Sequence, residues 1–162
     1  MPRSRPIAAM AIVALLAGLA LSIGLPMPRA QDAGRPAHDI LPYDDPVAVA
    51  EGRAVYDGFC AACHGANLEG EADWRSPGPD GRAKAPPHDA SGHTWHHPSA
   101  QLFAITKFGT AALVGNGYES NMIGFGDVLS DDEILAVLAY IKSTWPEEIR
   151  AVHSERNRLS GN

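Results

Sequence analysis

The stretch FCAACH, residues 59–64, decides how the rest of this 162-residue chain is interpreted. It contains the pattern C-x-x-C-H, which is typical of covalent haem attachment. Two cysteines three residues apart at a helix end can reach the two vinyl groups on one edge of a porphyrin, and each thiol then adds as a thioether. His64, which follows directly, is aimed at the iron. Because Cys60 and Cys63 are the only cysteines, we expect one covalent haem c.

Other uses of a cysteine pair explain this stretch less well. A disulfide or a thioredoxin-like dithiol suits an oxidising compartment, but the dithiol expects a βαβ context. A structural zinc site needs two further ligands and more often contains two such pairs. Chance occurrence is the third alternative. The helix-end position in a chain with an export-like start favours haem attachment over all three.

The second axial ligand of the iron is predicted from the methionines. The chain has four, and Met1, Met10 and Met27 all lie in the first thirty residues. Met122 therefore remains as the only thioether of the downstream domain, in a glycine-rich loop 58 residues after His64. Methionine opposite histidine raises the reduction potential and suits electron transfer. The alternatives are that Met122 fills a gap in the core or that a later histidine binds the iron instead.

Three segments show helical patterns. The first covers residues 46–60 and begins after Asp45, a good N-cap residue. The second covers 98–108. The third covers 131–145, where Ser130 and Glu133 have the spacing of a capping box. Strand patterns are not apparent, so the sequence predicts an all-α fold of three or more helices with long loops. A cofactor could supply the core around which the long loop after Cys63 wraps.

Several short motifs resemble those of class I cytochromes c, over about residues 46–146. They occur in the family's order: G-x-x-x-Y (52–56), C-x-x-C-H-G (60–65), M-x-x-F-G (122–126), L-S-D-x-E-I (129–134) and A-Y-I (139–141). The resemblance implies the cytochrome c fold, electron-carrier activity and His–Met ligation. It also implies that the first and last helices of the family fold cross, with Gly52 receiving the ring of Tyr140. A proline carbonyl, of Pro86 or Pro87, would hold the proximal histidine. Family members usually have proline after the ligand methionine, and here the residue is Ile123.

A histidine cluster lies before the second predicted helix. It consists of His88, His93, His96 and His97. Polar contact with haem propionates is the leading interpretation, with Trp95 covering the haem edge and donating its indole N–H to a propionate. A second metal, copper or zinc, is an alternative because imidazoles suit both ions. Iron ligation by one of these histidines is another. His38 and His153, outside the cluster, are expected to be solvated.

The two ends of the chain differ in character. Residues 1–30 combine Arg3 and Arg5 with a long apolar run, and they predict a signal peptide or an uncleaved membrane anchor. Either form gives a periplasmic domain, soluble or anchored on the outer face of the inner membrane. Residues 31–45 are predicted to be a linker, 46–146 the cytochrome c domain and 147–162 a polar tail, either a surface helix or frayed.

The charge balance restricts the partners. The whole chain has a net charge of −6, and removing residues 1–30 leaves 10 basic and 19 acidic residues, a net charge of −9. Nucleic acid is excluded because its binding needs a basic surface. A redox partner with a basic docking face is more plausible. The leading hypothesis is an electron carrier that is not an enzyme. The alternative is a haem enzyme, or a gas- or metal-binding subunit, with a displaceable sixth ligand.

Overall fold

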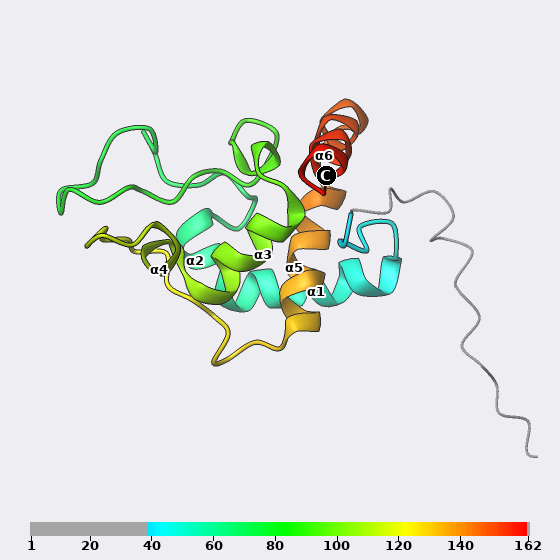
Figure 1. Ribbon diagram of the computed structural model, residues 1–162, viewed down its shortest axis with the longest axis horizontal. Helices are drawn as coiled ribbons and strands as arrows, with labels where there is room; N and C mark the ends of the chain where they lie inside the picture. Colours follow the sequence, from blue (N-terminus) through cyan, green and yellow to red (C-terminus); the bar gives the residue numbers. More distant parts are fainter. Residues whose placement is uncertain (1–38, 162) are drawn as a thin grey trace, which may run out of the picture.

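The computed structural model describes residues 39–161, so the predicted export segment 1–30 lies outside the described residues. Within that range the chain is helical and contains no strand, which confirms the all-α prediction (Figure 1). The elements are α1 (Pro46–Phe59), α2 (Ala61–His64), the 3-10 turn η2 (Thr94–His96), α3 (Ser99–Phe108), α4 (Thr110–Val114), α5 (Asp131–Ser143) and α6 (Glu147–Ser160). None of the helices in this range is both long enough and apolar enough to cross a bilayer.

Two of the predicted helix starts are confirmed by their caps. The Asp45 carboxylate accepts a hydrogen bond from the Val47 amide at 2.9 Å, which satisfies a donor that the first turn of α1 cannot pair internally. Ser130 and Glu133 form the expected reciprocal capping box at the start of α5. The starts of the first and third predicted helices are therefore fixed by local sequence, whereas α3 begins at Ser99 after Pro98 without a side-chain cap.

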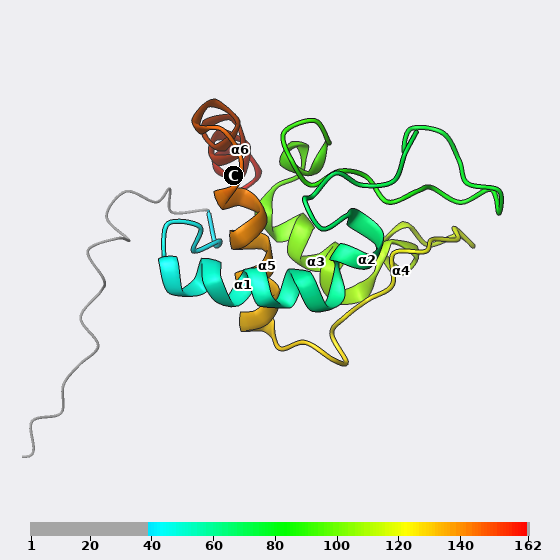
Figure 2. The same cartoon turned by 180° about the vertical axis from the view of Figure 1, so that it is seen from behind.

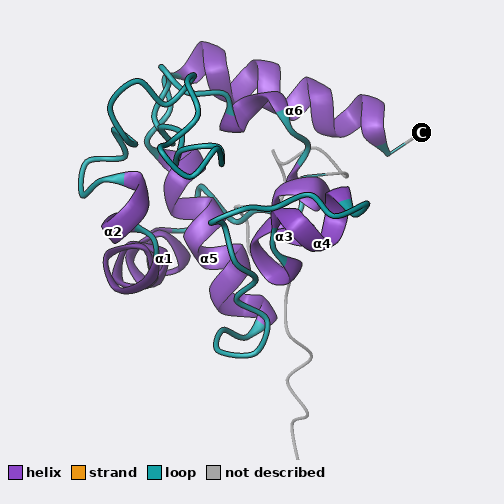
Figure 3. Cartoon of the chain, turned by 90° about the vertical axis from the view of Figure 1, so that its left-hand side faces the viewer, coloured by secondary structure: helices purple, strands orange, loops and turns teal. Residues whose placement is uncertain are grey.

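The core is built where α1 packs against α5 (Figure 3). Gly52 lies so close to α5 that a Cβ atom there would come within 1.9 Å of the Ala136 carbonyl oxygen. The Cβ of Tyr140 lies 3.0 Å from the same position, and the Tyr140 ring packs 5.5 Å from the Tyr56 ring with the Arg53 guanidinium over it. Gly52 thus admits both the backbone of α5 and the base of the Tyr140 side chain, while contact with the Tyr140 ring itself stays a prediction.

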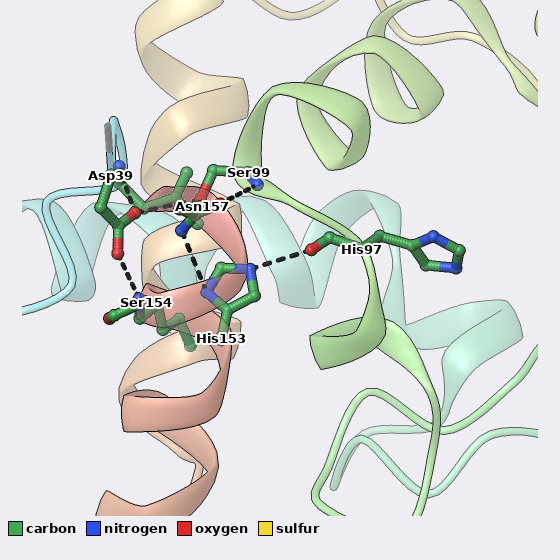
Figure 4. A network of polar contacts seen from close by, with 8 residues as sticks. Asp39, His97, Ser99, His153, Ser154 and Asn157 are labelled. Carbon is green, nitrogen blue, oxygen red and sulfur yellow. Dashed lines mark hydrogen bonds and ion pairs between the residues drawn. The ribbon is translucent and has the colours of Figure 1, made fainter. Parts of the chain in front are cut away.

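A buried polar network joins the first described residues to α5 and α6 (Figure 4). Asp39 and Lys142 form an ion pair in which neither side chain is exposed. The Ser99 hydroxyl donates to Asp39 at 3.0 Å, and the Asn157 amide donates to the same hydroxyl oxygen at 3.0 Å. Leu41 is also fully buried, so this end of the predicted linker contributes to the core.

α6 docks through polar side chains. His153 is fully buried, and its Nε2 lies 3.0 Å from the carbonyl oxygen of His97, just after η2. The expectation that His153 is solvated is therefore wrong. Since a carbonyl only accepts, Nε2 carries the hydrogen, and burial together with the nearby Lys142 ammonium lowers the pKa of His153 to about 4. The C-terminal segment forms a helix that is fixed at its centre rather than frayed.

Candidate functional site

A cavity of about 1190 Å³ lies between α2, α3, α5 and the long loops. It is somewhat larger than the roughly 300–1,000 Å³ typical of small-molecule sites. Much of its wall is apolar, formed by Phe59, Ile105, Leu113, Phe125, Val137, Leu138 and Ile141. The sequence-predicted residues Cys60, Cys63, His64 and Met122 line the same cavity. Two thiols, an imidazole and a thioether from two distant segments are thus brought together.

The two cysteines are presented by the junction between α1 and α2. Cys60 ends α1, and its carbonyl accepts the His64 amide at 2.9 Å, so the chain makes one further helical turn before it leaves. Both thiols are free, with Cys60 half-buried and Cys63 exposed. Burial and the proximity of Cys63 raise the pKa of Cys60 to about 11. Before covalent attachment, Cys60 is therefore a protonated thiol at neutral pH.

His64 is held with one ring nitrogen free. Its Nδ1 lies 2.8 Å from the carbonyl oxygen of Pro86, which identifies the proline that the sequence left undecided between Pro86 and Pro87. A carbonyl can only accept, so Nδ1 carries the hydrogen and Nε2 keeps the lone pair that a metal ligand needs. Burial lowers the pKa of His64 even though the Pro86 contact acts in the opposite direction. The imidazole is consequently neutral and oriented.

Tyr56 holds the turn at His64 and Gly65 by hydrogen bonding, a role that sequence reasoning missed. Its fully buried hydroxyl donates to the carbonyl of Gly65 at 2.9 Å and lies 3.3 Å from that of His64. The available signal was its position on the same face of α1 as Gly52, one turn before Cys60. Tyr56 therefore connects the packing of α1 to the placement of His64.

The histidine cluster does not converge on one point. His88 stacks on His64 with ring centroids 3.9 Å apart, so the two imidazoles lie face to face and cannot bind one iron from opposite sides. His93 stacks on Trp74 at 5.2 Å, while His96 packs against Trp95. Within residues 39–161, no group of three or more His, Cys, Asp or Glu side chains is arranged to hold a metal ion. The interpretation as a second metal site gains no support from this range.

The two tryptophans near the cavity differ in placement. Trp95 donates its indole N–H to the carbonyl of Ala90 at 3.3 Å and is not among the cavity-lining residues. Trp74 does line the cavity, as do Arg75, which lies over its ring at 4.2 Å, and His93. A haem contact by Trp95 stays a prediction. The sequence analysis missed Trp74, and the signal that could have found it is an aromatic residue within a long polar loop.

The segment after Met122 is fixed by backbone contacts. The Thr110 amide donates to the Met122 carbonyl at 3.2 Å, and an isolated bridge pairs Gly109 with Ile123. Gly109 has a φ of +82°, and a Cβ at Gly124 would come within 2.6 Å of the Phe108 carbonyl carbon. These glycines permit the close approach. The Met122 loop is therefore anchored on this side even though Ile123 occupies the usual position of proline.

The sequence also matches a family model, described as cytochrome c, over residues 49–145, which is more than half of the chain. The chain belongs to the cytochrome c family. No curated protein and no solved structure gives a significant match. As a family member this cytochrome carries a covalently attached haem c and functions in haem-based electron transfer, and family members are usually electron carriers. The spacing of Cys60 and Cys63 is compatible with attachment of one haem.

The cavity of this cytochrome fits such a group on its own chemistry. The two thiols lie at one helix junction, the neutral His64 imidazole has a free nitrogen, and the surrounding wall is mostly apolar. Apolar walls favour a flat hydrophobic ring and exclude water from the metal. Met122 is half-buried and lines the same space.

Proposed function

We propose that this cytochrome is an electron carrier whose haem is attached through Cys60 and Cys63 and ligated by His64 and Met122. The observation that carries the proposal is the meeting of these four side chains in one cavity. His64 further supports it, because the Pro86 carbonyl leaves Nε2 available. His–Met ligation raises the reduction potential and suits a carrier.

The bound haem supplies a one-electron couple, and the chain supplies a rigid setting for it. Pro86 and Tyr56 fix the His64 side, while the contacts from Thr110 and Gly109 fix the backbone at Met122. Ligands held from both sides move little when the oxidation state changes, which favours fast transfer. An electron carrier needs no acid–base step on a substrate, so we propose no catalytic residue and a carrier role in place of an enzymatic one.

The ligand assignment is tested by the ferric absorption spectra of wild type and Met122→Ala. We expect the far-red sulfur-to-iron band in wild type, its loss in the variant, and ready CO binding by the ferrous variant. Val128→Ala is a matched control, because Val128 is an exposed residue of the same segment that does not line the cavity. Matching spectra for wild type and Met122→Ala would overturn the assignment. Absence of the band in wild type, with ready CO binding, would instead favour the displaceable-ligand alternative.

We also propose that the protein is exported to the periplasm and docks a redox partner through the partner's basic face. The apolar run in residues 1–30 and the acidic balance of the remainder support this. Intact mass of the exported protein reads cleavage and haem number together. Export is refuted if the haem-bearing protein stays in the cytoplasm. Docking by charge is refuted if transfer rates do not fall as salt rises.

A further inference from the structure

Residues 71–85 form a closed loop that projects beside the Met122 loop (Figures 1 and 2). Its two ends are tied together, since the Glu71 amide donates to the Ala85 carbonyl at 2.9 Å and the Lys84 ammonium donates to the Ala72 carbonyl at 2.9 Å. Its tip is a turn in which the Gly78 amide donates to the Arg82 carbonyl at 2.8 Å. The tip of the loop thus has a conformation that is held by hydrogen bonds.

The tip contacts the residue directly before Met122. Arg82 donates through its guanidinium to the Asn121 side-chain oxygen at 2.9 Å, and the Asn121 side-chain nitrogen donates to the Asp80 carboxylate at 3.1 Å. A second Arg82 nitrogen lies 3.3 Å from the Glu119 carboxylate. Both ends of one amide are therefore paired with residues about forty positions away in the sequence.

These contacts determine the orientation of the Asn121 amide. The guanidinium can only donate and the ionised carboxylate can only accept, so turning the amide over would break both hydrogen bonds. The Asn121 contact, with help from the Arg82 backbone amide, lowers the pKa of Asp80. Asp80 accordingly stays ionised at neutral pH and retains its role as acceptor.

The two sides of Met122 are held differently. After Met122 the chain is fixed by backbone pairing to Gly109 and Thr110, as described above. Before Met122 the contact to the rest of the molecule runs through the side chains of Asn121 and Glu119 to the 71–85 tip. Since Ile123 lacks the restriction that proline imposes, the side-chain contacts before Met122 carry more of the positioning.

We propose that Arg82 and Asp80 at the tip of the 71–85 loop clamp Asn121 and thereby position Met122 against displacement by competing ligands. This inference rests on the proposed ligation by Met122. Arg82 and Asn121 are positioning residues, because they act through Met122 and do not touch the iron themselves. Loss of the clamp lets the loop swing away, which lowers the cost of replacing the thioether.

The test uses the haem-loaded full chain with imidazole as the competing ligand. In Arg82→Leu we expect the ferric protein to bind imidazole about tenfold more tightly than wild type does. When the pH is raised, the far-red band of Arg82→Leu should disappear at a lower pH than that of wild type. Asn121→Ala should give a similar change. The effect of the double variant should fall well short of the product of the two single effects, because both single variants remove the Arg82–Asn121 hydrogen bond. Arg53→Leu is the matched control, since Arg53 is an exposed arginine whose ion pair to Asp57 lies on α1. Arg53→Leu should leave imidazole affinity within about twofold of wild type.

The outcomes separate this proposal from the ligand assignment. If wild type lacks the far-red band, or Met122→Ala keeps it, the ligand assignment fails first. If Met122→Ala loses the band but Arg82→Leu binds imidazole as weakly as wild type, the clamp alone is refuted. A general loss of folding in Arg82→Leu would appear as a lowered melting temperature, and Asn121→Asp then serves as the second variant. It keeps the size of the side chain but replaces the donor to Asp80 with a second carboxylate, so repulsion from Asp80 should loosen the clamp. Unchanged imidazole affinity there would also overturn the clamp.

Discussion

The polar contacts at the two ends of the molecule look alike in kind but differ in burial. At one end, Asp39, Lys142, His153 and Asn157 are almost completely withdrawn from water. At the other, Arg82 and Glu119 leave 37% and 71% of their side chains exposed. Removing the partner of a buried charge lowers the stability of the fold strongly, whereas an exposed charge that loses its partner is still hydrated. We therefore expect the first end to determine global stability and the second to act on the cavity alone.

Breaking the buried ion pair should have the largest effect. Lys142→Met leaves the Asp39 carboxylate buried without its main cation, and we expect a loss of about 3–5 kcal/mol in the free energy of unfolding. Chemical denaturation of the haem-loaded protein measures this. The double variant Asp39→Leu/Lys142→Met should recover much of the loss, because neither charge remains. A single variant as stable as wild type would show that the pair does not control stability.

Acid should weaken the same end through His153. Its pKa falls from an ordinary 6.5 to about 4 on folding, so the unfolded chain binds the extra proton between these values. Stability should therefore decline as pH drops from about 6.5 to 4, by on the order of 3 kcal/mol from this residue. His153→Gln should flatten that part of the profile, whereas His96→Gln, at an exposed histidine, should not. Parallel profiles for wild type and His153→Gln would contradict the assignment.

Near the cavity, removing the buried hydroxyl of Tyr56 should have a smaller effect on stability than either change above. Tyr56→Phe removes the hydrogen bond to the Gly65 carbonyl and should cost about 1 kcal/mol of stability. The ring still packs on Tyr140, so the helix pair remains intact. Thermal unfolding measures the loss, and the ferric spectrum should keep its far-red band. A loss as large as that of Lys142→Met would remove the distinction between the two ends.

Local signals made much of the fold predictable. Asp45 and the pair Ser130 and Glu133 marked helix starts, and the cysteine spacing indicated the cavity. α6 was harder because its buried face consists of His153 and Asn157, which look like surface residues until their distant partners are known. For the same reason, the choice between Pro86 and Pro87 and the pairing of Arg82 with Asn121 could not be read from spacing. Contacts across a long loop depend on tertiary geometry, which leaves no local pattern.

Asp39 lies at the end of the domain opposite the cavity. Residues 39–45 and the start of α1 lie at one end of the molecule, while α2 and α4, which flank the cavity, lie at the other (Figures 1 and 2). Because Asp39 is held by Lys142 and Ser99, residue 39 is fixed at the end of the domain opposite the cavity. A membrane anchor joined at that end would hold the domain with its haem cavity facing away from the membrane. The cavity would then be accessible to soluble redox partners.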